Sequence, residues 1–250
     1  MPQFFFTFGK RRNRHTPNEH YNSVHMKKLL ISIDWKSKLT DLFIVVIGIT
    51  IAFRLNTWRE DLKCNQSEKY YLESFQRENA ANKAALIKSL NYCDSITRNI
   101  DTLIHLLRTR EKNDWWMKRL TLSMAAQGDY NPSTTILNNI TFSSEFATIR
   151  DPDLREQIIS TYNSHDATLR AQNILSDFVT SQVTPFLWKN IRYGTSEYGT
   201  YDFRKDPVFE NLVHGYRLLL QQQMTGYKEN LAGITQLEKA LNARAERVGK

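Results

Sequence analysis

Hydrophobic side chains recur at heptad spacing over a long part of the chain. Starting at Leu72, eleven positions alternately three and four residues apart form one series: Leu72, Phe75, Asn79, Asn82, Leu86, Ser89, Cys93, Ile96, Ile100, Leu103 and Leu107. Eight of them are apolar, and three polar residues weaken the series in its middle. No Gly or Pro occurs between Gly48 and Gly128. The pattern predicts a very long helix with one buried face, as in a helical bundle or a coiled coil.

Further helices are predicted downstream by a capping residue placed directly before a proline. The four such pairs are Asn131-Pro132, Asp151-Pro152, Thr184-Pro185 and Asp206-Pro207. Proline is favoured at the first helical position, so each pair predicts a helix start. The last predicted helix has the clearest apolar face, formed by Phe209, Val213, Tyr216, Leu220, Gln223, Tyr227, Asn230, Ile234, Leu237 and Leu241. No segment alternates with strand period, and we therefore expect an all-α fold.

An unbroken apolar run precedes these helices, from Leu42 to Phe53. Its length is short for a bilayer span, for which about 20 residues are needed. Trp35 and Trp58 bracket it, 23 residues apart, which is about 34 Å along a helix. We expect one transmembrane helix over residues 35–58, continuing into an elongated helical bundle. The predicted membrane-anchor residues are Trp35, Leu42, Phe43, Ile44, Val45, Val46, Ile47, Gly48, Ile49, Ile51, Phe53 and Trp58. A buried helix or one lying in the interface is the alternative.

The positive charge of the chain is concentrated before the apolar run. The net charge is +8, and residues 1–41 carry eight Lys or Arg against three acidic residues. Residues 55–250 are nearly neutral, which argues against a nucleic-acid partner and favours an anionic membrane surface. The excess of Lys and Arg before the run predicts a cytoplasmic amino terminus. We thus expect a basic cytoplasmic arm over residues 1–34, disordered at its start or translated only from Met26, and an extracytoplasmic helical body over residues 59–250.

No residue pattern indicates a catalytic, cofactor or metal site. The chain has no phosphate-binding loop and no nucleophile elbow, and its six His include no His-x-x-x-His pair. The acidic cluster of Asp151, Asp153 and Glu156 suits a helix amino terminus, and the flanking Arg150 and Arg155 would form a local charge network with it.

Two aromatic features could instead serve a ligand. A loop over residues 192–205 contains Tyr193, Tyr198 and Tyr201, which would either cap the bundle or line a ligand cleft. The neighbouring Trp115 and Trp116 are better explained by core packing than by a ligand cage.

Two cysteines lie 29 residues apart, Cys64 and Cys93. On one continuous helix they are about 43 Å apart, which excludes a bridge between them. Cys93 falls in the heptad series, where it would either meet its own copy in a parallel dimer or lie buried in a monomeric bundle. Cys64 has polar neighbours, and we expect it to be the more exposed thiol.

Several short motifs resemble a family of uncharacterised bacterial single-pass membrane-anchored proteins, a domain of unknown function. They are the apolar segment 46–53 with Asn56-Thr57-Trp58-Arg59-Glu60, the Tyr70-Tyr71-Leu72 step, and, further on, Asp129-Tyr130-Asn131-Pro132 and Tyr162-Asn163. The resemblance covers about residues 35–245; the arm before it has no counterpart there. It implies an inner-membrane anchor and a helical extracytoplasmic body, and no activity.

Together these features favour a membrane-anchored, non-enzymatic helical module for scaffolding, interaction or sensing. Its partners would be the lipid bilayer and either another protein or a second copy of the chain. The alternative is a periplasmic ligand-binding protein or enzyme that uses the Tyr-rich loop.

Overall fold

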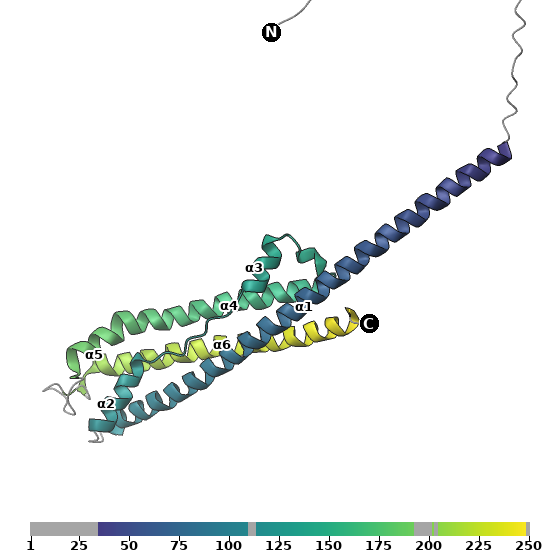
Figure 1. The fold of residues 1–250 in the computed structure, drawn as a ribbon. Helices are drawn as coiled ribbons and strands as arrows, with labels where there is room; N and C mark the ends of the chain where they lie inside the picture. The colour runs from purple at the N-terminus through teal and green to yellow at the C-terminus, as the bar shows by residue number, and fades with distance from the viewer. Residues whose placement is uncertain (1–34, 110–113, 193–201, 203–204, 249–250) are drawn as a thin grey trace, which may run out of the picture. The chain divides into compact units, whose positions relative to one another are not determined.

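The described part of the chain is predominantly helical. The computed structural model describes residues 35–109, 114–192, 202 and 205–248, among which there is no strand (Figure 1). The all-α prediction is therefore confirmed. The helices are α1 (Trp35–Thr109), α2 (Asp114–Leu122), α3 (Thr135–Phe142), α4 (Pro152–Phe178), α5 (Thr184–Asn190) and α6 (Pro207–Val248). Short 3₁₀ turns follow α2 and α3, and a π-helical turn, Val179–Val183, joins α4 to α5.

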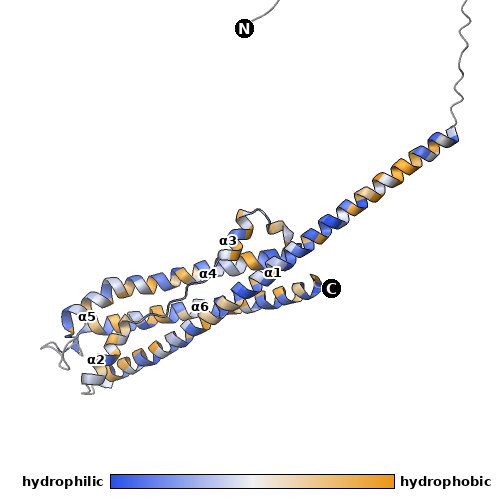
Figure 2. Ribbon diagram, viewed as in Figure 1, coloured by the Kyte–Doolittle hydropathy of each residue, from blue (hydrophilic) through white to orange (hydrophobic). Residues whose placement is uncertain are grey.

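The chain divides into two compact units, residues 1–54 and residues 55–250. The described residues of the first unit, 35–54, form the amino-terminal part of α1, and every side chain assessed there is exposed. Its apolar residues form the continuous hydrophobic stretch near the start of α1 in Figure 2. The second unit, called the body below, contains the rest of α1 and all other helices.

The heptad series of α1 forms the inner face of this helix in the body. Ten of its eleven positions are buried, and the exception is Leu107, which is half-buried. The neighbouring Leu106 is buried in its place. An ideal α-helix has 3.6 residues per turn, so a strict 3.5-residue series rotates by about 20° per heptad relative to the helix. The series accordingly leaves the core at its far end.

The predicted face of α6 is also confirmed, since all ten of its residues are buried. α4 and α6 pack against each other in antiparallel directions. Ala171 lies near Gly226 and Phe178 near Gly215, so higher numbers on one helix meet lower numbers on the other. The body has two apolar clusters, a larger one shared by α1, α2, the π turn, α5 and α6, and a smaller one around α3 and the start of α4.

Two of the four predicted helix starts are confirmed. Asp151 caps α4, and its Oδ1 accepts hydrogen bonds from the backbone N–H groups of Asp153 and Leu154, each at 3.1 Å. Asp206 Oδ1 accepts one from Val208 N at 2.8 Å, at the start of α6.

Neither of the other two pairs caps a helix as predicted, although α5 does begin at Thr184 and the predicted helix through Ile136 and Ile140 is present as α3. Asn131-Pro132 lies in an irregular connection, and α3 begins only at Thr135. Thr184-Pro185 lies inside a continuous helical stretch from α4 through the π turn to α5. Pro185 lacks an N–H group and its ring would clash with the carbonyl four residues earlier. A wider π turn directly before the proline is a common way to accommodate such a residue without ending the helix.

Candidate functional site

The predicted anchor residues all lie on α1. All of them except Trp58 belong to the first unit, and Trp58 lies at the start of the body. Their apolar side chains remain exposed, from 42% for Ile47 to 72% for Trp35. Of the described residues, one helix is long and apolar enough to cross a membrane, and its apolar window has a mean hydropathy of 1.8 with no buried residue. The alternative of a core helix buried within the chain is thus not what the structure shows. Exposed apolar surface on this scale is costly in water, and the helix is a candidate membrane span by its length and composition.

The polar groups of this segment are satisfied within the helix. The hydroxyl of Thr40 donates to the carbonyl of Lys36 at 2.9 Å, and that of Thr50 donates to the carbonyl of Val46 at 2.7 Å. Each hydroxyl therefore has a partner without water, as an apolar environment requires. The charged Asp41 and Arg54 lie at the two ends of the run.

The body contains a connection that is not helical, residues 126–134, called the strap below; Gly128 and Tyr130 are buried in it, and its other residues are partly or fully exposed. Backbone N–H and C=O groups of irregular segments that lie against the core need partners. Side chains of α1 and α6 supply several of them. Tyr216 donates to the carbonyl of Ala126, Tyr227 and Gln223 donate to that of Gly128, and Ser89 donates to that of Asp129.

The strap explains the polar residues in the middle of the heptad series. The amide of Asn82 binds both backbone groups of Ser133, donating to its carbonyl at 2.9 Å and accepting from its N–H at 2.8 Å. Ser89 faces the strap as well, whereas Asn79 donates to the carbonyl of Ile234 on α6 at 3.0 Å. Each of these polar side chains thus forms a hydrogen bond with a backbone group of another segment.

A carboxylate of α1 stabilises the start of α3. The carboxylate of Glu78 accepts hydrogen bonds from Ile136 N at 3.2 Å, from the hydroxyl of Ser133 at 2.7 Å and from the phenol of Tyr162. α3 has no side-chain cap of its own. Glu78 therefore takes the place of a capping residue and puts negative charge at a helix amino terminus. Burial, together with the hydrogen bond to Glu78, raises the pKa of Tyr162.

His165 lies in the same buried layer, with only 1% of its surface exposed. Its Nδ1 is 3.1 Å from Asn230 Oδ1 and 3.3 Å from the hydroxyl of Tyr130. Burial lowers the pKa of His165, so its neutral form is favoured. A general base must reach a substrate, and a side chain buried among Tyr130, Tyr162 and Asn230 does not. We therefore assign His165 to packing and hydrogen bonding.

A buried ion pair joins α1 to the end of α6. Glu68 is 0% exposed, and its Oε1 accepts from Arg244 Nε at 2.9 Å and from Arg150 N at 3.1 Å. The Arg150 guanidinium lies 3.5 Å from Asp61. The predicted local network of Arg150 and Arg155 with Asp151 and Asp153 is wrong: Arg150 pairs across the fold.

Arg155 also departs from that prediction, because its guanidinium donates to the carbonyl of Ile149 at 2.6 Å. These partners could not be predicted from the sequence, because Asp61 and Glu68 lie more than 80 residues before Arg150.

The structure describes only some of the aromatic residues that were considered for a ligand site. Tyr193, Tyr198 and Tyr201 lie outside the described residues, so the predicted ligand loop stays a prediction. Trp116 packs partly buried against the main apolar cluster, as predicted. Trp115 is 60% exposed and stacks on Trp116, and the Arg119 guanidinium lies 5.7 Å from each ring centre.

The described residues contain no group of three or more His, Cys, Asp or Glu that could hold a metal ion. Comparison with known proteins adds no family: no protein-family model, no curated protein and no solved structure matches the chain.

Proposed function

We propose that this chain is a single-pass membrane protein whose helical body acts as a non-enzymatic interaction module, for scaffolding or sensing, on the outer side of a bacterial inner membrane. The observation that carries the proposal is the exposed apolar stretch at residues 42–53, on the same helix that supplies the inner face of the body. An apolar stretch with internally satisfied hydroxyls and charges only at its ends suits a bilayer.

The orientation rests on charge. Lys and Arg before the apolar run outnumber acidic residues, whereas the body is nearly neutral. Positively charged flanks stay on the cytoplasmic side, which puts the amino-terminal arm inside and the body outside.

The non-enzymatic role rests on where the polar side chains of the body are used. Glu78, His165 and Gln223 are buried and bonded to backbone or to other side chains. They stabilise the strap and the start of α3, and so they support a rigid body with surfaces for a partner.

Extraction of membranes tests the anchor. We expect the wild-type chain to stay in the membrane fraction after washing with sodium carbonate, and the double substitution of Val46→Lys and Ile49→Lys to release it. Each Lys near the middle of a span costs about 2.5–3.5 kcal/mol for insertion. The matched control combines Ile174→Lys with Leu218→Lys, which places the same two charges on exposed apolar residues of α4 and α6 and should leave the chain in the membrane. Release of the wild-type chain by carbonate would refute the anchor.

A further inference from the structure

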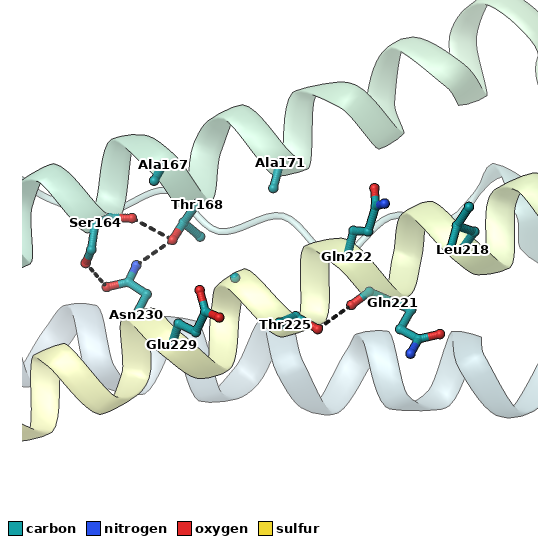
Figure 3. A pocket seen from close by; sticks show the side chains of 11 residues that line it. Ser164, Ala167, Thr168, Ala171, Leu218, Gln221, Gln222, Thr225, Glu229 and Asn230 are labelled. Atoms are coloured by element: carbon teal, nitrogen blue, oxygen red, sulfur yellow. Dashed lines mark hydrogen bonds between the residues drawn. The ribbon is translucent and has the colours of Figure 1, made fainter.

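Two hollows lie end to end between α4 and α6 on the body, and we call them together the α4–α6 groove. Their volumes are about 490 and 470 Å³, and they share Ser164 and Glu229. Figure 3 shows the first hollow, with α4 and α6 on its two sides and Ala167 and Ala171 facing across from Gln222 and Thr225. Along α6 the groove extends from Leu218 to Gln236, which is about 27 Å.

Two glycines of α6 keep this groove open, and helix packing does not require them. A Cβ atom at Gly226 would lie 4.0 Å from the Cβ of Ala171, and one at Gly233 would lie 3.9 Å from Ser164 Oγ, both ordinary contacts. By contrast, a Cβ atom at Gly215, outside the groove, would come within 3.1 Å of the Phe178 ring. A glycine inside a helix costs about 1 kcal/mol relative to alanine. Gly226 and Gly233 are seven residues apart on one face, and what they provide is space in the groove.

The groove is also negatively charged. Asp153, Glu156 and Glu229 line it, and neither hollow has a Lys, Arg or His in its lining. None of these three carboxylates has an ion-pair partner among the described residues, whereas Glu68, Asp101 and Glu238 are each paired with a basic side chain. In a nearly neutral body, this groove complements a positively charged partner. It repels a second copy of itself.

The hydrogen bonding of the groove favours a helical partner over an extended one. An extended chain needs donors and acceptors for its backbone, as the strap shows. The groove hydroxyls are already used within their own helices: Thr225 donates to Gln221, Thr168 to Ser164 and Thr161 to Gln157. A helix satisfies its own backbone and packs closely where side chains are small.

We propose that the α4–α6 groove binds one helix of a partner protein, about 18 residues long, with small or apolar side chains over its middle and Lys or Arg at one end. The basic end lies over Asp153 and Glu156 in the second hollow, and Glu229, which lines both hollows, lies where this end meets the apolar part of the partner helix. The proposal deepens the proposed interaction function and rests on it, because it names the surface and the chemistry of the partner.

The test uses the full chain in nanodiscs of zwitterionic phosphatidylcholine and a fluorescent 18-residue helical peptide as the probe. The peptide carries Ala and Leu along one face and Lys at one end; a second peptide has Glu in place of each Lys. We expect saturable binding of the Lys peptide by fluorescence anisotropy, and binding at least about tenfold weaker for the Glu peptide. Empty nanodiscs give the background.

Two variants locate the binding. Gly226→Leu fills the groove and should weaken binding at least about tenfold, while circular dichroism stays unchanged and the melting temperature does not fall. Glu229→Gln should weaken it about threefold or more. The matched control is Glu210→Gln, an exposed glutamate of α6 outside the groove, which should bind as wild type.

No saturable binding of the Lys peptide up to about 1 mM would overturn the proposal, as would equal binding by Gly226→Leu or by the Glu peptide. These results concern only the groove. If the anchor proposal fails, the chain does not incorporate into the nanodiscs. This outcome is distinct from a failure to bind the peptide.

Discussion

At the scale of single residues, a glycine is required where other atoms already fill the space that a Cβ atom would occupy. A Cβ atom at Gly128 would lie 2.5 Å from Cys93 Sγ and 3.0 Å from the carbonyl oxygen of Ser89. Gly128 is therefore required by the approach of the strap to α1. Gly226 has no such neighbour, so the two glycines should respond oppositely to the same substitution.

We predict that Gly128→Ala destabilises the body by about 1–3 kcal/mol, because the added methyl group overpacks a filled site. Gly226→Ala should be neutral or stabilising by up to about 1 kcal/mol. Urea unfolding monitored by circular dichroism measures both. Adding Cys93→Ala to Gly128→Ala should recover part of the loss, and equal stabilities for the two single variants would contradict the assignment.

The two cysteines should differ in reactivity. Cys93 is fully buried, and burial raises its pKa to about 11, so its thiol stays protonated at neutral pH. Cys64 is partly exposed. We expect maleimide to label Cys64 in the folded chain and Cys93 only after denaturation, as read by mass spectrometry of the digested protein. A covalent dimer, if one forms on oxidation, should disappear with Cys64→Ser and survive Cys93→Ser.

His165 should make stability depend on pH. Because burial lowers its pKa in the folded state, the unfolded state binds more protons as the pH falls through about 6.5. This contribution to stability is therefore complete above that pH and is lost below it. We expect the difference in unfolding free energy between pH 7.5 and pH 5.5 to be smaller in His165→Gln than in the wild type. An unchanged difference in the variant would show that other groups cause the dependence.

At the scale of elements, the strap separates what the sequence could predict from what it could not. Periodicity identified the buried faces of α1 and α6, because helix burial repeats locally along the chain. The strap has no period, and its partners Asn82, Ser89 and Gln223 come from distant helices. From the sequence alone, the polar residues Asn82 and Ser89 indicated only a weaker heptad series in α1. Only the structure shows that they pair with the backbone of the strap.

Asn82→Leu distinguishes these two interpretations. If the heptad series alone determined stability, leucine would complete the apolar face and stabilise the helix. The structure predicts the opposite, a loss of about 1–3 kcal/mol, because both backbone groups of Ser133 lose their partly buried hydrogen bonds to Asn82. Urea unfolding measures the change, and Asn99→Leu, at an exposed position of the same helix, should change stability by less than about 0.5 kcal/mol.

At the scale of the whole molecule, α1 serves two environments with different side-chain patterns. Residues 42–53 are apolar on every side, as expected for a helix surrounded by lipid, whereas the later part of α1 is apolar on one face only. The change from one pattern to the other is visible in the sequence, which is why the anchor and the bundle could both be predicted. The groove could not, because it depends on which faces of α4 and α6 meet.

The side of the membrane on which the body lies is the last prediction. The Lys and Arg excess before the apolar run, and the Trp residues on both sides of it, predict that the carboxyl terminus is extracytoplasmic. A reporter enzyme that is active only in the periplasm, fused after Lys250, should therefore be active, and a reporter active only in the cytoplasm should be silent there. Moving the charge bias should reverse this result: replacing Lys27, Lys28, Lys36 and Lys38 by Gln, and adding Lys after Trp58, should lower the periplasmic signal and raise the cytoplasmic one. The reverse pattern in the wild type would put the body, and the groove with it, in contact with cytoplasmic partners.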